Sequence, residues 1–530
     1  MRALRANLDG LLVEVDDLDQ ALALLASLQE DPPAGVTELV PAARTVLLQF
    51  DPSRTTAQRL AAEVRARDLR GASRSSGASV DIEVVYDGED LAEVADLCDL
   101  SVEEVVARHT APEYTVAFTG FAPGFGYLSG GDPVLRVPRR ATPRTVIPAG
   151  TVAVAGEFSG IYPRSSPGGW RLLGSTDAVL FDLDRDPPAL FEPGGQVRFV
   201  AVREHITGSA AQTRAQATPE AAPTTAAPAV PALEVLDPGG QSLLQDLGRS
   251  GVAALGVSPS GAMDRGALRR ANRLVGNPPG TTAIETVLGG LTLRARGDVV
   301  VATAGATAPV TVAGRSVEPE TPVALDDGET LTLGPPAAGV YTYLAVRGGL
   351  DVAPVLGSTS RDVLAGLGPA PLAAGDVLAV GTASVDAVTR EPGPDLPGPE
   401  GSVTLDVVLG PRTDWCTPES LDRLTGQDWL VTPRSNRVGL RLEGAEPLTR
   451  RITDELPSEA TVAGALQVPP SGQPVLFTAD HPLTGGYPVI GCVATYHLDL
   501  AAQVPPGSSV RFRVVEPFAD LVAGQRGDTA

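Results

Sequence analysis

Residues 118–176 contain the densest group of side chains that could bind a ligand. Phe118–Tyr127 reads FTGFAPGFGY, in which glycine and proline alternate with aromatic residues, so no helix can form. Such a loop exposes backbone N–H groups, and Arg139 and Arg144 follow it. Free amides beside guanidinium groups suit an anionic or carbonyl-bearing ligand. The alternative is a barrel-closing segment whose arginines bind solvent or surface carboxylates.

His109 is one of four histidines in the chain. It falls at the end of a predicted helix that begins with the capping-box spacing of Ser101 and Glu104. A helix C-terminus favours the imidazolium form, and imidazole can act as acid or base near neutral pH. A histidine that merely caps the helix fits the same position.

Three carboxylates and an arginine lie within a short stretch of the second half of the chain. They are Asp246, Arg249, Asp264 and Glu285. A buried carboxylate beside arginine keeps its charge and can orient a substrate. Helix capping and structural ion pairing are the alternative for each of these residues.

The last part of the chain adds a further group of polar residues. Arg437 and Arg441 are an even number of residues apart, so on a strand they would share a face. Asp480 and His481 could form an acid–base pair, but adjacent residues of a strand point in opposite directions.

The composition excludes several chemistries. The 41 basic residues are all arginine, because the sequence contains no lysine. The chain therefore carries no Walker A lysine, Schiff-base lysine or biotinylated lysine. A net charge of −23 repels a phosphate backbone, which argues against nucleic acid as a partner.

Cysteine usage and the opening residues indicate a compartment. Cys98, Cys416 and Cys492 are far apart, which fits neither a disulfide framework nor a zinc site and is typical of a reducing cytosol. Residues 1–20 carry acids where a signal peptide has an apolar run. We expect a cytoplasmic protein with no membrane span and no metal site of its own.

The elements that must position these residues are mainly strands. The 58 glycines and 48 prolines among 530 residues favour a β-rich, mixed α+β fold over a helical bundle. Residues 8–86 predict the order β-α-β-β-α-β, with strands at 11–15, within 37–50 and at 80–86, and helices at 18–28 and 56–66. This order is that of a ferredoxin-like unit.

Composition shifts divide the rest of the chain. Residues 209–231 are rich in alanine, proline and threonine, as in a linker, and a weaker break lies at 390–401. Similar turn-and-strand segments at 192–199 and 505–512 favour related β-barrel lobes on both sides of the linker. The predicted domains are 1–86, 87–208, the linker 209–231, and two lobes at 232–395 and 396–530.

Many of these motifs occur together in one known pair of families. The first half resembles the family of the bacterial 5-oxoprolinase B subunit, also called allophanate hydrolase subunit 1, at Phe118–Tyr127, Pro138–Arg144, Pro148–Gly150 and Ile161–Trp170. The second half resembles the family of the C subunit, at Leu244–Arg249, Ser260–Asp264, Ala271–Asn277, Tyr343–Gly349, Leu356–Ser360 and Arg437–Arg441. The chain is thus similar to a fusion of the two subunits. One departure is Asn436, where the family of the second half usually has aspartate.

The resemblance implies a ferredoxin-like unit followed by a cyclophilin-like β-barrel, and then two further β-barrel lobes. It also implies a non-autonomous hydrolase component that works with a separate A subunit to open 5-oxoproline, a cyclic amide, to glutamate. The complex would use ATP with Mg²⁺, any ATP site on this chain would rely on arginine and backbone amides, and no biotin would be attached covalently.

Under this interpretation, His109 and Asp264 are the candidates for proton transfer, and Arg139, Arg144 and the amides near Gly124 and Gly168 would hold an anion. The remaining candidates for substrate contact are Ser166, Gln245, Arg249, Asn272, Glu285, Arg437 and Gln467. The linker is long enough for the two halves to pack together around a shared site, within one chain or in a homo-oligomer.

Two other functions fit the same resemblance. One is a carboxyltransferase-type component that acts on urea or a related amide, with biotin supplied by another protein. The other is a regulatory module that inhibits a histidine kinase through the N-terminal half.

Overall fold

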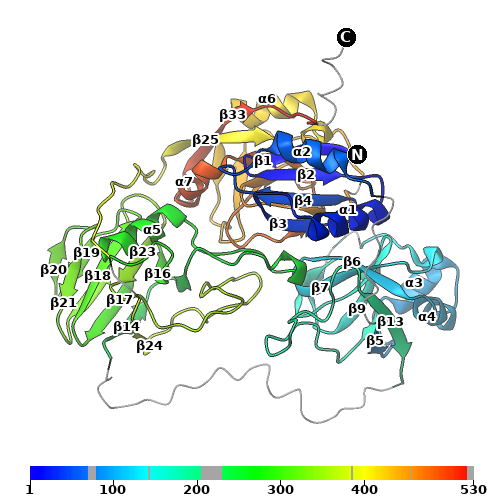
Figure 1. Ribbon diagram of the computed structural model, residues 1–530, viewed down its shortest axis with the longest axis horizontal. Helices are drawn as coiled ribbons and strands as arrows, with labels where there is room; N and C mark the ends of the chain where they lie inside the picture. Colours follow the sequence, from blue (N-terminus) through cyan, green and yellow to red (C-terminus); the bar gives the residue numbers. More distant parts are fainter. Residues whose placement is uncertain are drawn as a thin grey trace.

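The computed structural model describes residues 1–69, 79–140, 142, 144–203, 230–383, 386–454 and 456–521. Figure 1 shows the N-terminal sheet beside the C-terminal barrel in the upper part of the molecule, with one lobe below on each side. Apart from residues 230 and 231, the predicted linker lies outside the described residues.

A four-stranded antiparallel sheet with two helices opens the chain. Its elements are β1 (Arg2–Asn7), β2 (Gly10–Glu14), α1 (Leu18–Glu30), β3 (Val36–Pro41), β4 (Thr45–Phe50) and α2 (Ala57–Ala66). The strand order is β1-β2-β4-β3. Asp17 and Thr56 cap the two helices, since each side chain accepts a backbone N–H of the first turn.

Both faces of this sheet are buried, and each covers a different core. One face packs under α1 and α2 through Leu11, Val13 and Leu48. The other face packs on the C-terminal barrel, where Leu12 and Leu47 share a hydrophobic core with residues such as Phe477 and Val489. Burial on both sides explains why these strands are almost continuously apolar in sequence.

The next lobe is a seven-stranded sheet in the order β12-β9-β10-β7-β6-β13-β5, which the bridge between Val85 and Ser175 closes. Its elements are β5 (Ser79–Val84), α3 (Leu91–Cys98), α4 (Val102–Thr110), β6 (Tyr114–Gly120), β7 (Ala122–Ser129), η1 (Pro133–Leu135), β8 (Arg144–Ile147), β9 (Thr151–Ala155), β10 (Phe158–Ile161), β11 (Ser166–Gly168), β12 (Arg171–Ser175) and β13 (Gln196–Ala201).

The strand predicted at 80–86 does not complete the N-terminal sheet. It forms β5, which pairs in parallel with β13 inside the seven-stranded sheet. A strand that the sequence analysis did not predict, β1, takes the place in the N-terminal sheet next to β2. The reason is the pairing available to each edge, which the pattern of a single strand does not encode.

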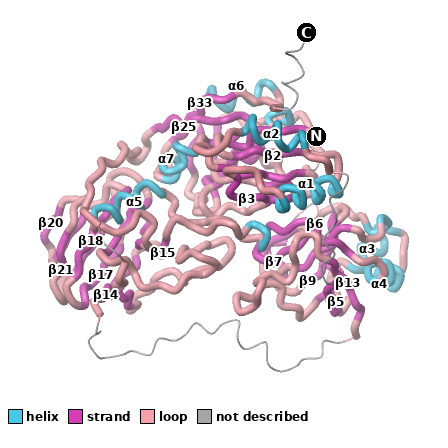
Figure 2. The backbone as a smooth tube through the Cα atoms, viewed as in Figure 1, coloured by secondary structure: helices cyan, strands magenta, loops and turns pink. Residues whose placement is uncertain are grey.

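The first lobe of the second half packs a six-stranded and a five-stranded sheet face to face around an aliphatic core. Its elements are β14 (Ala232–Pro238), β15 (Ser242–Gln245), η2 (Ala253–Leu255), α5 (Arg265–Leu274), β16 (Ala283–Val287), β17 (Leu291–Arg296), β18 (Val299–Gly305), β19 (Val310–Val312), β20 (Arg315–Val317), β21 (Val323–Leu325), β22 (Thr330–Leu333), β23 (Tyr341–Val346) and β24 (Val377–Ala379). Figure 2 shows long loops that cross from this lobe toward the seven-stranded one.

The last lobe is a closed barrel in the order β25-β32-β29-β30-β27-β26-β33. Its elements are β25 (Ser402–Leu409), η3 (Thr413–Trp415), α6 (Pro418–Gly426), β26 (Trp429–Val431), β27 (Gly439–Gly444), β28 (Glu459–Ala460), β29 (Ala465–Gln467), β30 (Val475–Phe477), β31 (Thr484–Gly485), β32 (Val489–Val493), η4 (Thr495–His497), α7 (Leu498–Ala502) and β33 (Ser509–Glu516). The β-rich fold with barrel-like sheets is confirmed.

Polar contacts reinforce the junction between the two halves of the chain. Buried Arg412 forms ion pairs with Glu14 of the N-terminal sheet and with Glu459 of its own lobe. The Asn7 side chain donates to the Val493 carbonyl at 3.1 Å. These contacts fix the N-terminal sheet against the barrel on the face where their shared core lies.

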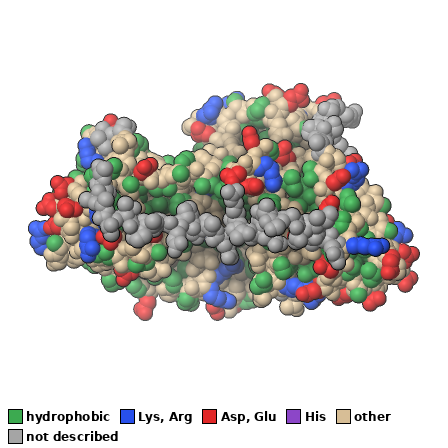
Figure 3. Space-filling view, turned by 90° about the horizontal axis from the view of Figure 1, so that it is seen from below, with side chains coloured by type: hydrophobic (Ala, Val, Ile, Leu, Met, Phe, Trp, Pro, Cys, Tyr) green, Lys and Arg blue, Asp and Glu red, His purple; other side chains and the backbone are tan. Residues whose placement is uncertain are grey.

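Two further findings concern the charged surface of the molecule and the length of its helices. Figure 3 shows acidic and arginine side chains interspersed on the face seen there, without a broad basic patch. Among the residues that the structure describes, no helix is both long enough and apolar enough to cross a membrane.

Candidate functional site

The main cavity, about 570 Å³ in volume, lies where three parts of the fold meet. The N-terminal sheet, the segment from Leu247 through α5, and the C-terminal barrel with α7 each supply part of its wall. The side chains in the wall that can carry charge are Asp9, Glu38, Arg249, Arg265, Arg269, His481 and Asp499. Both halves of the chain are therefore needed to enclose this space.

Two carboxyl groups of the N-terminal sheet face the cavity. Asp9 lies in the turn between β1 and β2 and accepts a hydrogen bond from the Thr495 hydroxyl at 3.0 Å. Glu38 of β3 accepts the backbone N–H of Gly251 at 2.6 Å and that of Ala253 at 3.3 Å. Burial raises the pKa of both carboxyls above the ordinary value. A carboxyl with a raised pKa is suited to proton transfer near neutral pH.

Arg249, a predicted site residue, lines this cavity and is almost fully buried. Its Nε donates to the Val355 carbonyl at 3.2 Å, and its Nη2 donates to the Ser360 carbonyl. Its Nη1 is buried without a hydrogen-bond partner in the described part of the chain. Burial lowers the pKa of this guanidinium group. The side chain thus holds the Val355–Ser360 loop and leaves one donor unused.

His481 reaches the cavity, whereas its neighbour Asp480 points elsewhere. The His481 ring is buried and its Nδ1 lies 2.9 Å from the Pro482 carbonyl. Burial lowers its pKa, so the ring is neutral near pH 7. The two residues do not form an acid–base pair, because the Asp480 carboxylate is bound to Arg437.

Arg437 joins the two lobes of the second half through a buried ionic network. Its Nε donates to Asp480 at 2.9 Å, and its Nη1 forms an ion pair with Glu285 of β16. All three residues are at most 2% exposed. Asp480 also accepts the Ser260 hydroxyl at 2.6 Å. The structure thus brings two predicted site residues, Glu285 and Arg437, into direct contact.

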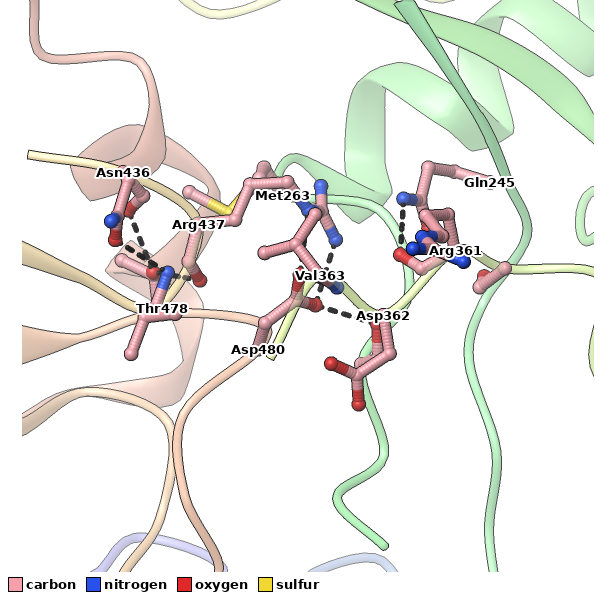
Figure 4. Close-up of polar contacts among 12 residues, drawn as sticks. Gln245, Met263, Arg361, Asp362, Val363, Asn436, Arg437, Thr478 and Asp480 are labelled. Atoms are coloured by element: carbon pink, nitrogen blue, oxygen red, sulfur yellow. Dashed lines mark hydrogen bonds and ion pairs between the residues drawn. The ribbon is translucent and has the colours of Figure 1, made fainter. Parts of the chain in front are cut away.

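Figure 4 shows Asp480 between Arg437 on the barrel side and Val363 on the side of the first lobe. The backbone N–H of Val363 donates to Asp480 at 3.0 Å. At the far end, the Gln245 side chain donates to the Arg361 carbonyl at 2.8 Å. These groups bind one another, so the network positions the cavity wall and does not itself face a ligand.

Asp264 caps α5 and lies behind the cavity wall. Its Oδ1 accepts the Ala267 N–H at 2.7 Å, and its Oδ2 accepts the Gln503 side-chain amide at 2.9 Å. Burial and the nearby Asp499 raise its pKa to about 6. Both carboxylate oxygens have protein partners, and this is the capping role that the sequence left open as the alternative.

The segment Phe118–Tyr127, predicted to be a loop that holds an anion, instead forms parts of the paired strands β6 and β7, and side-chain packing closes it. In a buried aromatic cluster, Phe118 stacks on Tyr127, and Phe125 makes edge-to-face contacts with Tyr127 and Trp170. Gly124 has a positive φ of 78°, and a Cβ there would lie 2.9 Å from the Leu180 carbonyl oxygen. Only about 10 Å³ of space remains where the turn between β6 and β7 meets the second half.

The arginines after that loop have carboxylate or aromatic neighbours. Arg144 forms two hydrogen bonds of 2.8 Å with Asp90 and an ion pair with Glu89. Arg139 lies close enough to Tyr127 to influence its pKa. The prediction of an anion site in this segment is therefore wrong for Arg144, because its charge is already neutralised.

The small residues of the same segment have structural roles. The Ser166 hydroxyl donates to the Arg164 carbonyl at 3.3 Å. At Gly168 a Cβ would lie 2.2 Å from the Tyr162 hydroxyl, so only glycine fits there. Neither residue lines the main cavity.

His109 is enclosed in the core of the seven-stranded lobe. Its Nδ1 lies 2.7 Å from the Tyr86 hydroxyl and its Nε2 lies 2.9 Å from the Ser159 hydroxyl. Burial lowers its pKa to about 3, so the expectation of a cation at the helix end is wrong. The structure does not bring His109 together with Asp264.

The predicted amide side chains stabilise loops. Asn272 donates to the Leu268 carbonyl at 3.2 Å and to the Thr281 carbonyl at 2.7 Å. Gln467 donates to the Tyr487 carbonyl at 3.3 Å. Of the residues predicted to contact substrate or to transfer protons, only Arg249 lines the main cavity, together with His481 of the acid–base pair that the sequence analysis considered.

Sequence reasoning missed Asp9, Arg265 and Arg269, which do line the cavity. Asp9 carries no sequence signal, since it sits in an ordinary turn. The two arginines do have a sequence signal, because the helical segment Arg265–Leu274 contains four arginines and no acidic residue. Such a helix cannot neutralise its own charges with partners three or four residues away.

Comparison with known families agrees with this architecture. Residues 1–191 match the family model described as carboxyltransferase domain, subdomain C and D. Residues 255–514 match the one described as carboxyltransferase domain, subdomain A and B. The fold and the shared cavity thus define a chain with both parts of a carboxyltransferase-type domain.

Individual relatives narrow the family. The C subunit of 5-oxoprolinase from Escherichia coli K12 is 35% identical over 284 residues, which cover 53% of this chain and 90% of the relative. The B subunit of 5-oxoprolinase from Haemophilus influenzae is 42% identical over 156 residues, which cover 29% of this chain and 70% of the relative. The crystal structure of TTHA0988 is 37% identical, with a TM-score of 0.81, over 96% of this chain and 100% of that one.

The chain belongs to the family of the B and C subunits of 5-oxoprolinase, with the half that is similar to the B subunit first and the half that is similar to the C subunit second. The expectation of a fused chain is confirmed.

Proposed function

We propose that this protein is the fused B and C component of an ATP-dependent 5-oxoprolinase that requires a separate A subunit. The names of the relatives of both halves support this function. The observation that carries it is the cavity of about 570 Å³, whose wall contains side chains from both halves. A site built this way needs the two halves together.

The chemistry of the reaction fits an activated amide. A lactam is stabilised by resonance, so its carbonyl resists water. The carbonyl oxygen first attacks the γ-phosphorus of ATP, and ADP leaves. Water then adds to the activated carbon and the ring C–N bond breaks, which leaves an acyl phosphate. A second water hydrolyses the acyl phosphate to the new carboxylate and free phosphate. The ring nitrogen takes up a proton and becomes the amine of glutamate.

The carboxyl groups in the cavity supply a route for that proton. Asp9 and Glu38 both have raised pKa values, and they take the role that the sequence analysis gave to His109 and Asp264. We assign proton transfer to Asp9, because both of Glu38's carboxylate oxygens accept backbone N–H groups. ATP and Mg²⁺ enter as co-substrates of the whole complex.

The test is a reconstitution. The chain, mixed with its A-subunit homologue, 5-oxoproline, ATP and Mg²⁺, should form glutamate and ADP in equal amounts. Asp9→Asn should lower kcat by about 10²–10⁴-fold. The matched control Asp16→Asn changes an exposed carboxylate of the same unit and should leave kcat unchanged. No turnover in the complete mixture would contradict the proposed function.

A second function is favoured by one observation, the match of both halves to carboxyltransferase subdomains. In that case the chain moves a carboxyl group between a biotin carrier and urea or a related amide. Because the chain has no lysine, the biotin must be attached to another protein. Transfer of labelled carboxylate from a carboxybiotin carrier to urea, in the absence of the A-subunit homologue, would favour this function over the first.

A further inference from the structure

The four arginines of α5 differ in their partners. Arg270 lies 3.8 Å from the Glu320 carboxylate, and Arg273 forms an ion pair with Glu391 at 2.5 Å. In contrast, no carboxylate of the described residues lies within 4 Å of the guanidinium groups of Arg265 and Arg269. The helix thus carries two neutralised charges and two that are not.

The two arginines of α5 that have no carboxylate partner among the described residues, Arg265 and Arg269, both line the main cavity. They are four residues apart, so they lie one above the other on the same face of α5. Two like charges at this spacing repel each other, and each weakens the helix. An anion between them would remove the repulsion.

The environment of the Arg265 side chain suits a group that binds a ligand. Its side chain is accessible to solvent. Because the surrounding protein atoms of the cavity displace part of its water, the pKa of its guanidinium group is lowered. Among the described residues, its side chain makes one hydrogen bond, a long one of 3.3 Å from Nη2 to the Ser260 carbonyl. Most of its donors therefore remain available to a ligand.

The start of α5 is not what would bind the anion, because its amides are occupied. The N–H groups of Arg265 and Gly266 each donate to Asp499 at 2.9 Å. That of Ala267 donates to Asp264 at 2.7 Å. The donors that remain are the guanidinium groups.

The carboxyl groups of the cavity limit the charge that the anion can carry. Asp9, Glu38 and Asp499 line the same cavity and would repel a polyphosphate. A single carboxylate fits between the arginines, and Asp9, whose side chain accepts one hydrogen bond, from the Thr495 hydroxyl, can accept an N–H from the rest of the molecule. An acid that carries an amide N–H matches both the arginines and Asp9.

We propose that Arg265 and Arg269 form a subsite for the carboxylate of a small amide-bearing organic acid. The identity of that acid as 5-oxoproline rests on the function proposed above, whereas the subsite itself does not. In this arrangement the ring amide points toward Asp9, on the side where proton transfer is required.

The experiment measures binding to the full chain by calorimetry with 5-oxoproline, with 2-pyrrolidinone, which is the same ring without the carboxylate, and with ATP. Arg265→Gln and Arg269→Gln should each raise the Kd for 5-oxoproline about 10- to 100-fold, as expected for a lost charge-assisted hydrogen bond. Binding of 2-pyrrolidinone should not change. The control Arg273→Gln removes an arginine from the same helix and should leave all three affinities unchanged.

Three outcomes would overturn the subsite: no preference of the unsubstituted chain for 5-oxoproline over 2-pyrrolidinone, equal affinities in the variants, or weaker binding of ATP alone. Failure of the two proposals can be told apart. Hydrolysis with an unchanged KM in both variants removes the subsite and leaves the function. Carboxylate binding that depends on Arg265 without hydrolysis removes the function and leaves the subsite.

Discussion

At the scale of single residues, Arg437 is a buried cation that pairs with two buried acids in the second half. It is fully buried between Glu285 and Asp480. Its guanidinium group forms an ion pair with each of these two carboxylates. Removal of the cation would leave two carboxylates buried without an opposite charge.

Arg437→Met is therefore expected to lower the free energy of unfolding by about 3–5 kcal/mol. Urea unfolding followed by tryptophan fluorescence measures this loss. Arg441→Met is the control, because Arg441 is exposed on β27. Equal unfolding midpoints for the two variants would show that the network contributes no more than a surface arginine.

A second prediction at this scale concerns Asp362 and the pH dependence of stability. It is buried, and it accepts the Ala365 N–H at 2.7 Å and the Ser258 hydroxyl at 3.2 Å. Burial and the neighbouring Asp480 raise its pKa from 3.8 to about 6, against the attraction of Arg249. The folded state then binds more protons than the unfolded state between these two values, so stability falls as pH rises from about 4 to about 6.

Asp362→Asn keeps the shape and removes the titration. We expect the variant to be more stable than the unsubstituted chain above pH 6, by up to about 3 kcal/mol, and equal to it below pH 4. Urea unfolding at several pH values measures the difference. Asp395→Asn changes an exposed carboxyl and should show no such trend; a trend of opposite sign in Asp362→Asn would refute the argument.

Sequence patterns found some of these residues but not their contacts. Glu285 and Arg437 were both singled out by type and motif, yet they are separated by 152 residues. Arg144 was singled out for its charge, and its partner Asp90 was not considered. The type of a residue is visible in a sequence, whereas the neutralisation of its charge depends on which loop folds against it.

At the scale of elements, η2 is the piece that connects three parts of the molecule. The Thr119 hydroxyl of β6 donates to the Ala254 carbonyl at 2.9 Å, and Glu38 of β3 binds the N–H groups of Gly251 and Ala253 at its start. Gly256 ends η2 with a φ of 76°. A Cβ at this position would lie 2.8 Å from the Ala122 carbonyl oxygen.

Gly256→Ala should therefore cost more than backbone strain alone. Gly251 is a matched control, since its φ is 75° and a Cβ there meets nothing within 4 Å. We expect each variant to lose about 1–2 kcal/mol from the left-handed backbone, and Gly256→Ala to lose a further 1–3 kcal/mol or so from overpacking. The unfolding midpoints of the two variants measure these losses. Equal losses would mean that the backbone around Ala122 moves away from the new Cβ at no cost in stability.

Local patterns predicted the helices better than the sheets. Leucines at helical spacing predicted α1, and the capping box predicted α4, whose reciprocal hydrogen bonds are present. The strand β5 was found in sequence but assigned to the wrong sheet, because strand partners are chosen by tertiary packing. Arg437 and Arg441 do not share a face, since Arg437 precedes β27 and lies in a loop.

At the scale of the whole molecule, the two halves behave as one folded body. The shared core and the Arg412 ion pairs join the N-terminal sheet to the barrel independently of the linker. Cleavage at a protease site inserted within 209–231 should therefore leave one species on size exclusion, even in 1 M salt. Two separately eluting fragments, with the uncleaved chain as reference, would disprove this.

The residues that line the cavity could not have been predicted from sequence. Asp9, Arg265 and His481 meet there although they are hundreds of residues apart. No spacing rule connects a turn, a helix and a loop of three different units. The sequence did predict that the halves would enclose a site with arginine, and it placed most of that arginine in the wrong segment.

The two-sided burial of the N-terminal sheet has a consequence for how such a protein is made. A first half synthesised alone would expose an apolar sheet face, which favours self-association. It would also have to find a separately synthesised second half by diffusion. Joining both in one polypeptide fixes their ratio at one to one and holds them at an effective concentration in the millimolar range or so. A cell that produces the joined form has no need to balance the output of two genes.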